Sequence, residues 1–174
     1  TAYRYFPSQS ALIAAVVDQS LGPILQWQPQ SDDAAERIDE LLRFAYPRLQ
    51  QHEASLRAAI MVSLQQYAEA SAGQNPDTPR LVRGHRVDTL KHVTAPLASQ
   101  LEPAAHQRVI RALSLLYGTE VFLILKDIWH LELDDIVDVV TWAAQAIVRQ
   151  AQQEAGIAPT SGKTPAKRKR NAPG

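Results

Sequence analysis

The chain has 174 residues, of which 45% are hydrophobic, enough for one domain with a substantial core. It contains no cysteine, which excludes disulfides and thiolate metal sites and suits a cytoplasmic protein. The net charge is zero, but residues 156–174 carry five basic residues and no acid, so residues 1–155 hold 13 basic against 18 acidic residues. With this excess of acidic residues, residues 1–155 are not expected to form a broad nucleic-acid-binding surface. No signal segment opens the chain, and we expect sequence upstream of Thr1 to be absent.

The first 25 residues predict the end of one helix, a turn and a second helix. Residues 1–6 are typical of the last turns of a helix, and Pro7-Ser8 ends it, with Ser8 as the N-cap of the next. The second helix has its apolar face at Ala11, Leu12, Ala15 and Val16. Gly22-Pro23 interrupts or ends that helix.

Residues 1–17, TAYRYFPSQSALIAAVV, resemble the end of the helix-turn-helix of the TetR (tetracycline-repressor-like) family of transcriptional regulators. The matching residues are Thr1, Tyr3, Tyr5, Phe6, Pro7 and Ser8. The resemblance implies that Thr1 and Tyr3 lie on the recognition helix and that Tyr5 reaches a DNA phosphate. Gln9 stands where the family has Lys, which removes one charge-assisted phosphate contact, although the helix N-terminus can still donate to phosphate.

The resemblance implies an all-α protein in three parts: residues 1–20, the end of the helix-turn-helix domain and a linking helix; 21–155, a helical effector-binding and dimerisation domain; and 156–174, a disordered basic tail. A recognition helix needs a companion helix to hold it on DNA, and that helix is not in this sequence. We therefore expect residues 1–174 alone to bind operator DNA weakly or not at all. We interpret the KRKR run of the tail as solvated rather than as a phosphate contact.

Two helices are predicted between residues 31 and 72. Ser31-Asp32-Asp33 is a capping sequence for the first, whose apolar positions follow helical spacing at Ile38, Leu41, Leu42, Ala45 and Leu49. Pro47 should kink or break this helix near Tyr46. The second runs from about Glu53 to Ala72.

The next helix, at about 79–100, is predicted to begin at Thr78-Pro79 and to bend near His92 because of Pro96. Its apolar side carries Leu90, Val93 and Leu97. Arg80, Arg83 and Arg86 drift across its outer side, and we interpret them as a solvated, salt-bridged face rather than as an anion site.

The stretch Val109–Trp129 is apolar on nearly every side and predicts a central helix with Gly118 in its middle, at a close helix crossing. A last helix, Ile136 to about Glu154, follows a corner where Asp134 or Asp135 is the cap. Together these two helices carry more apolar surface than the core of one subunit needs. In the resembled family such a pair forms a four-helix interface, so we expect an isologous homodimer burying on the order of 2,000 Å². The expected interface residues are Gly118, Phe122, Leu125, Val140, Trp142 and Ile147.

An effector cavity is expected among the helices between residues 31 and 129, two of which contain a proline. Its expected wall is Phe44, Ile60, Leu64, Tyr67, Leu90, Leu113, Tyr117 and Glu120. A mostly apolar wall with a few polar atoms suits an apolar or amphipathic organic effector. Glu120 either orients the ligand or pairs with an arginine at an interface, and the sequence leaves both open.

No catalytic or metal site is predicted, and no cofactor. The five histidines are scattered, none in a tight metal-ligand spacing, and no glycine-rich phosphate loop occurs. Three functions remain: a dimeric DNA-binding regulator, most simply a repressor, released by its effector; an all-helical enzyme, which lacks a convergent polar site; and an all-helical adaptor without a ligand, which predicts a filled core. We expect operator DNA, a small molecule and a second copy of the chain as partners, and no membrane.

Overall fold

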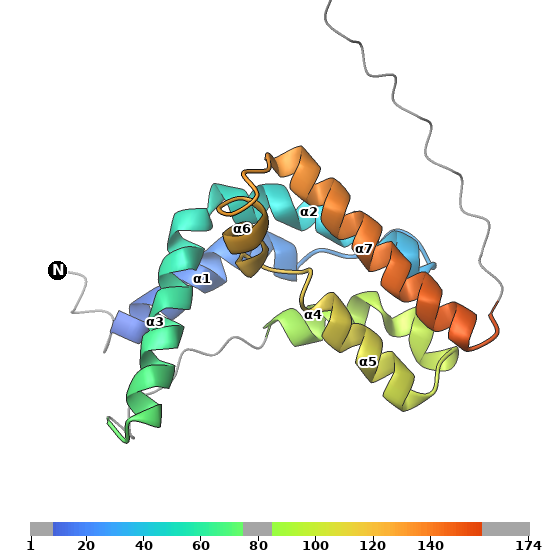
Figure 1. The fold of residues 1–174 in the computed structure, drawn as a ribbon, viewed down its shortest axis with the longest axis horizontal. Helices are drawn as coiled ribbons and strands as arrows, with labels where there is room; N and C mark the ends of the chain where they lie inside the picture. The colour runs from blue at the N-terminus through green and yellow to red at the C-terminus, as the bar shows by residue number, and fades with distance from the viewer. Residues whose placement is uncertain (1–8, 75–84, 158–174) are drawn as a thin grey trace, which may run out of the picture.

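A computed structural model describes residues 9–74 and 85–157, and within these ranges every regular element is a helix (Figure 1), which confirms the all-α prediction. The elements are α1 (Gln9–Leu25), α2 (Ala34–Gln51), α3 (Glu53–Ser71), α4 (His85–Val93), the 3₁₀ helix η2 (Ala95–Ser99), α5 (Pro103–Leu113), α6 (Glu120–Leu125) and α7 (Leu133–Glu154). None of the described helices combines the length and apolar content that crossing a bilayer requires.

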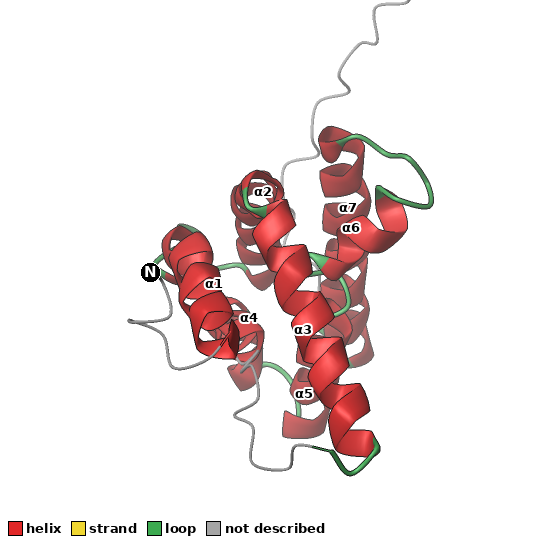
Figure 2. Ribbon diagram, turned by 90° about the vertical axis from the view of Figure 1, so that its left-hand side faces the viewer, coloured by secondary structure: helices red, strands yellow, loops and turns green. Residues whose placement is uncertain are grey.

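Helix α2 is the centre of the fold. It packs along α7 and also contacts α1, α3, α4 and η2, so its apolar positions are covered on several sides (Figure 2). Leu41, Leu42 and Tyr46 of α2 are fully buried, and the ring of Phe122 packs edge-on against Tyr46, with 5.6 Å between the ring centroids. One continuous core therefore joins α2 to α7 and to the α5–α6 region.

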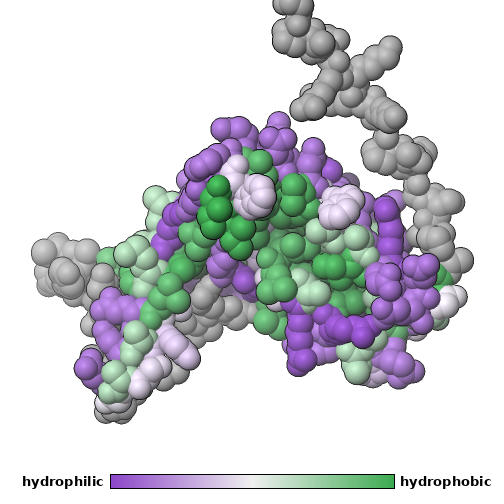
Figure 3. Space-filling view, viewed as in Figure 1, coloured by the Kyte–Doolittle hydropathy of each residue, from purple (hydrophilic) through white to green (hydrophobic). Residues whose placement is uncertain are grey.

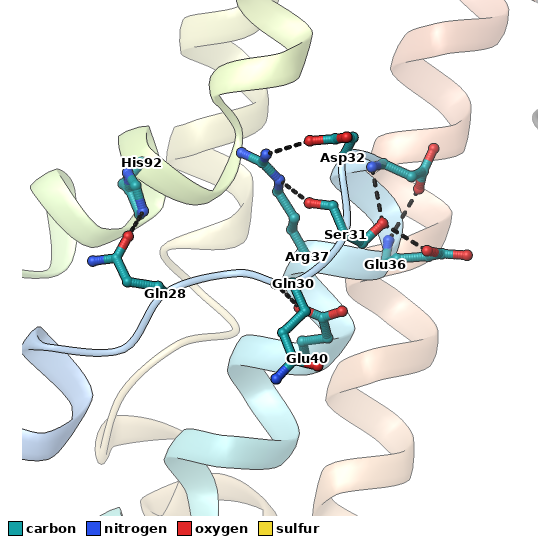
Figure 4. Close-up of polar contacts among 9 residues, drawn as sticks. Gln28, Gln30, Ser31, Asp32, Glu36, Arg37, Glu40 and His92 are labelled. Carbon is teal, nitrogen blue, oxygen red and sulfur yellow. Dashed lines mark hydrogen bonds and ion pairs between the residues drawn. The ribbon is translucent and has the colours of Figure 1, made fainter.

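The predicted cap of α2 is confirmed. Asp33 is the N-cap, and its carboxylate accepts from the backbone N–H groups of Ala35 and Glu36 at 2.9 and 3.0 Å. Ser31 donates to the Glu36 carboxylate at 2.6 Å, and Arg37 reaches back to the Ser31 carbonyl, as Figure 4 shows. The Asp33 carboxylate therefore satisfies two N–H groups that the first turn of a helix leaves without partners, and the other two contacts hold the loop against that turn.

The polar loop between α1 and α2 makes hydrogen bonds to both α4 and α2. The Gln28 side chain and the ring of His92 lie 3.0 Å apart, joining the loop to the end of α4 (Figure 4). Nearer α2, the backbone N–H of Gln30 donates to the Glu40 carboxylate at 2.9 Å. The α1–α2 connection is therefore held by a hydrogen bond to α4 and by another to α2. These two contacts fix the course of the chain where α1 ends.

Two prolines lie inside helices that continue past them, and a third follows the end of a helix. Helix α2 continues through Pro47 to Gln51, so a break at Pro47, one of the two predicted outcomes, is wrong. Pro47 and Arg43, whose carbonyl loses its amide partner, are both exposed, so water can take that partner's place. Helix α1 likewise continues through Pro23. Pro96, in contrast, is near the start of η2, just after α4 has ended. The predicted start at Thr78-Pro79 is outside the described residues.

The predicted continuous helix over Val109–Trp129 is wrong. Helix α5 ends at Leu113, the chain turns through residues 114–119, and α6 is short. Two carbonyls in the turn bond to distant side chains: the Tyr46 hydroxyl donates to Leu116 O at 2.6 Å, and Arg86 donates to Ser114 O at 3.3 Å. These donors, distant in sequence, stabilise the turn in place of helical hydrogen bonds.

Gly118 is part of this turn rather than of a helix. Its φ is +140°, a conformation that L side chains rarely adopt. A Cβ at this position would lie 2.2 Å from Nη2 of Arg86 and 2.7 Å from the Glu120 carboxylate. Glycine therefore permits both the turn and the close approach of the Arg86 guanidinium, and the neighbour of Gly118 is a charged side chain rather than the close helix that we predicted.

Charged side chains connect α3 to the end of α6. Arg57 makes two hydrogen bonds with the Asp127 carboxylate, at 2.6 and 2.7 Å, and Glu53 accepts from Lys126 at 2.7 Å. Glu53 also pairs with Arg57, so the four side chains form one network. Hydrogen bonds from Lys126 and Arg57 outweigh the opposing effect of burial and lower the pKa of Glu53. The network fixes α3 beside the turn that leads to α7.

Candidate functional site

An apolar cavity of about 110 Å³ lies where α1, α3, α4 and the turn before α6 meet. Its apolar wall comes from three helices: Val17, Leu21, Ile24 and Leu25 of α1, Leu49 of α2, and Leu56, Ala59 and Ile60 of α3. Its polar wall is His85, Arg86, Tyr117, Gly118, Thr119 and Glu120. The cavity therefore has the composition of a small-molecule site, mostly apolar with a few polar groups on one side.

An ion pair forms part of the polar wall. Nη2 of Arg86 is 2.5 Å from the Glu120 carboxylate, and the two side chains are 30% and 34% exposed. The guanidinium also donates to the Ser114 carbonyl, and it lies directly over the backbone of Gly118. Its position is therefore fixed by the turn that forms this side of the cavity.

Two tyrosines are buried around the same turn. Burial raises the pKa of the Tyr117 phenol to about 12, and a hydrogen bond with Thr89 opposes this only partly. Burial also raises the pKa of Tyr46, whose hydroxyl donates to Leu116 O. The polar wall is therefore supported by phenols that remain protonated well above the usual tyrosine range.

The Tyr117 shift predicts a loss of stability in alkali. Between about pH 10 and pH 12 the unfolded chain releases the Tyr117 proton while the folded chain keeps it, so the free energy of unfolding falls as pH rises. This phenol alone contributes about 1.4 kcal/mol per pH unit in that range. Urea unfolding from pH 9 to 12 measures the slope, which should become shallower in Tyr117→Phe. Tyr67→Phe, which changes an exposed phenol, should keep the original slope; equal slopes in all three chains would contradict the prediction.

The structure divides the predicted pocket residues into three groups. Ile60, Tyr117 and Glu120 line the cavity. Phe44, Leu90 and Leu113 belong to or pack against the core: Leu90 and Leu113 are fully buried, and Phe44 contacts the Trp27 ring and the Arg48 guanidinium. Leu64 and Tyr67 are 61% and 72% exposed on α3 and are not part of the cavity wall.

Several wall residues were not among the predicted ones. Leu21 and Ile24 come from the carboxyl-terminal end of α1, inside the predicted effector-binding domain but outside the helices from which the wall was predicted. Arg86 was predicted to belong to a solvated, salt-bridged face; it does form a salt bridge, with Glu120, and this pair lies at the cavity. A signal for this pair existed in the sequence, because a carboxylate inside an apolar stretch needs a partner. Glu120 does pair with an arginine, within the one chain.

A second candidate site is an exposed apolar face. Figure 3 shows apolar surface over α3 and α6 and on toward α5 and α7. The large exposed side chains in these elements and the turns beside them are Met61, Leu64, Tyr67, Leu115, Ile124, Ile128, Trp129, Val139 and Trp142. Exposed apolar area that is continuous is typical of surfaces that bind another macromolecule.

Within this area, the α7 face consists of Val139, Trp142 and Ala146 together with Ile147. The first three are spaced three and four apart, so they project from one side of the helix, and Trp142 is 74% exposed. Ala146 and Ile147 also line a groove against α5. The α7 face is therefore an apolar surface on one of the two segments where a dimer interface was predicted, and the groove beside it borders the other.

The predicted interface residues are distributed unevenly. Trp142 is exposed, and Leu125 and Ile147 are half-buried. Phe122 and Val140 are 0% and 1% exposed, inside the core of the single chain, so an interface cannot use them directly. Phe122 and Val140 were predicted at an interface because both lie in stretches with more apolar residues than one face can hold. In the structure both side chains belong to the core of the single chain.

Of the predicted DNA-binding residues, Thr1, Tyr3 and Tyr5 are outside the described residues, and Gln9 is the first residue of α1. Among the described residues, no group of three His, Asp or Glu side chains comes together that could hold a metal ion. Three of the five histidines instead make pairwise contacts: His85 with Asp18, His92 with Gln28 and His106 with Thr94.

The chain matches no protein-family model, no curated protein sequence and no solved structure.

Proposed function

We propose that the chain is the regulatory part of a TetR-like, homodimeric transcriptional regulator, most simply a repressor. In this proposal the cavity takes a small amphipathic effector, and the α7 face pairs with its copy. The motif-level support is the likeness of residues 1–17 to the end of the family's helix-turn-helix. The companion helix that such a reader requires would have to precede Thr1.

The observation that carries the proposal is the position of the cavity beside α1. Four apolar residues of α1 form part of the wall, and α1 begins at Gln9, directly after Ser8, the last of the residues that match the family's motif. A ligand in the cavity therefore touches the helix that connects the two functions. A change in the position of α1 would alter the spacing of the two readers in a dimer.

Effector action requires a difference in affinity. A ligand shifts the equilibrium only if it binds the DNA-releasing conformation more tightly than the DNA-bound one. An almost complete shift from 1:99 to 99:1 needs about 10⁴-fold preference. The Arg86–Glu120 pair and the turn around Gly118 are the parts of the wall that such a ligand would contact on its polar side.

The proposal is tested in two steps. A thermal-shift screen of the chain against small apolar and amphipathic compounds should find ligands; one present at 100 times its Kd adds about 2.7 kcal/mol to the stability. The full-length protein should then select a palindromic duplex from a random pool, with half-sites about one helical turn apart, and the ligand should release it. All binding must be compared at one salt concentration. No stabilising compound, or a selected duplex that the ligand leaves bound, would refute the effector function.

An adaptor function is the second candidate, and the apolar ridge of α3 favours it. Met61, Leu64 and Tyr67 are each more than 60% exposed, and they run from the middle of α3 toward its carboxyl-terminal end. A ridge of this kind is suited to a helical partner. The adaptor function predicts that no compound stabilises the chain.

A further inference from the structure

The cavity has two chemically different ends. The α1 and α3 side is lined by aliphatic groups, among them Leu21, Leu56 and Ile60. The opposite side presents a positive and a negative group next to each other, Arg86 and Glu120, with 2.5 Å between them. A ligand that fills this space must place a hydrocarbon group at one end and meet both charges at the other.

The charges of Arg86 and Glu120 cancel, and this restricts the net charge that the polar end of a ligand can carry. A lone carboxylate would have to share Arg86 with Glu120, and a lone ammonium would have to share Glu120 with Arg86. Either ion adds net charge to a part-buried site, which is unfavourable without further compensation. His85, also on the wall, lies 3.1 Å from the Asp18 carboxylate. A ligand with both charges keeps the balance.

We propose that the cavity binds an apolar α-amino acid as a zwitterion. This inference rests on the effector function proposed above and names the ligand class for the same site. The ligand carboxylate accepts from N–H groups of Arg86, which has five, of which the Ser114 carbonyl and Glu120 engage one each. The ligand ammonium donates to the Glu120 carboxylate. The side chain of the amino acid lies among Leu21, Leu56 and Ile60.

The size of the cavity selects among amino acids. A cavity of about 110 Å³ is somewhat smaller than the roughly 150 Å³ space that holds benzene in an engineered protein core. Only the side chain of the amino acid has to lie in that space, because its two charged groups stay at Arg86 and Glu120. The four-carbon side chains of leucine and isoleucine suit that volume, whereas the indole of tryptophan exceeds it and the methyl group of alanine leaves most of it empty. Each buried CH₂ changes affinity roughly fourfold, so leucine, with three more carbons, should bind about sixty times more tightly than alanine.

Calorimetric titration of the chain with matched ligands tests the charge requirement. L-Leucine carries both charges, 4-methylpentanoate carries only the carboxylate, and 3-methylbutylamine carries only the ammonium, while their alkyl groups are alike. We expect leucine to bind at least about tenfold more tightly than either analogue, because each analogue lacks one charge-assisted hydrogen bond. Equal affinity of leucine and either analogue would overturn the proposal.

Two substitutions test the residues. Glu120→Gln keeps the shape of the side chain and removes its charge, and Arg86→Met removes the guanidinium; each should weaken leucine binding at least about tenfold. The matched control is the Arg43–Asp39 pair of α2, at 2.9 Å and away from the cavity, where Arg43→Met should leave leucine binding unchanged. The melting temperature without ligand checks that each variant is folded. If Arg86→Met does not fold, Glu120→Gln alone decides, and unchanged leucine affinity in Glu120→Gln refutes the site.

The outcome also separates this inference from the function on which it rests. If other compounds stabilise the chain and leucine and isoleucine do not, the amino-acid inference is wrong while the effector function stands. If no compound of any class stabilises the chain, both are wrong and the adaptor function remains.

Discussion

Replacing Phe122 by alanine should lower the free energy of unfolding by about 3–5 kcal/mol. The side chain is completely buried, and its ring packs edge-on against Tyr46 in the middle of the core. Truncation removes the buried ring and leaves a space that the surrounding helices can close only in part. Urea unfolding followed by circular dichroism, at one protein concentration because a dimer is stabilised by mass action, measures the loss.

The control for this substitution is in the same short helix. Ile124 is two positions further along α6 and is 55% exposed, so Ile124→Ala should cost less than about 1 kcal/mol. A Phe122→Ala chain with unchanged stability that has become monomeric would show that Phe122 contacts a second copy instead, and the described packing of α6 would then be wrong.

Replacing Trp142 by glutamate should separate the proposed dimer into folded monomers. Trp142 is the largest exposed side chain of the α7 face, and a charge there would be buried without a partner if two copies paired. Central aromatic residues of interfaces typically contribute 2–4 kcal/mol, so the dimer Kd should rise by about 30-fold to 1,000-fold. Sedimentation velocity over a range of concentrations measures this, and circular dichroism confirms that the helices persist.

Tyr67→Glu is the matched control, because Tyr67 is 72% exposed on the ridge of α3 and not on the α7 face. It should leave the dimer intact. If Tyr67→Glu gives monomers while Trp142→Glu remains dimeric, the copies pair through α3. If the unaltered chain is monomeric at every concentration, the dimer proposal is wrong.

Local signals predicted some helices closely. The capping sequence at Asp33 and the apolar spacing that follows it placed the start of α2, and α3 was predicted to end one residue later than it does. The last helix was expected to begin at Ile136 with Asp134 or Asp135 as the cap, whereas α7 begins at Leu133 and both acids are in its first turn. These features depend on residues a few positions apart, which a sequence displays directly.

The interruption between α5 and α6 could not be predicted in the same way. The side chains that bond to its carbonyls are distant in sequence: Tyr46 is 70 residues from Leu116, and Arg86 is 28 from Ser114. The hydrophobic periodicity of that stretch does not indicate these distant partners. Taken alone, it predicts a continuous helix. The same tertiary contacts bring Arg86 to Glu120 and thereby form the charged side of the cavity, which explains why the predicted wall was only partly recovered.

The exposed position of Met61 makes it a natural reporter of what covers α3. It is the only methionine of the chain, and its side chain is 70% exposed on the ridge. A mild oxidant converts an accessible thioether to the sulfoxide, which adds one oxygen atom and is detected by mass spectrometry. Because the chain has no cysteine, no thiol competes for the oxidant. The rate of this single conversion therefore reports whether a macromolecule has docked on α3, in the unlabelled and unmutated protein.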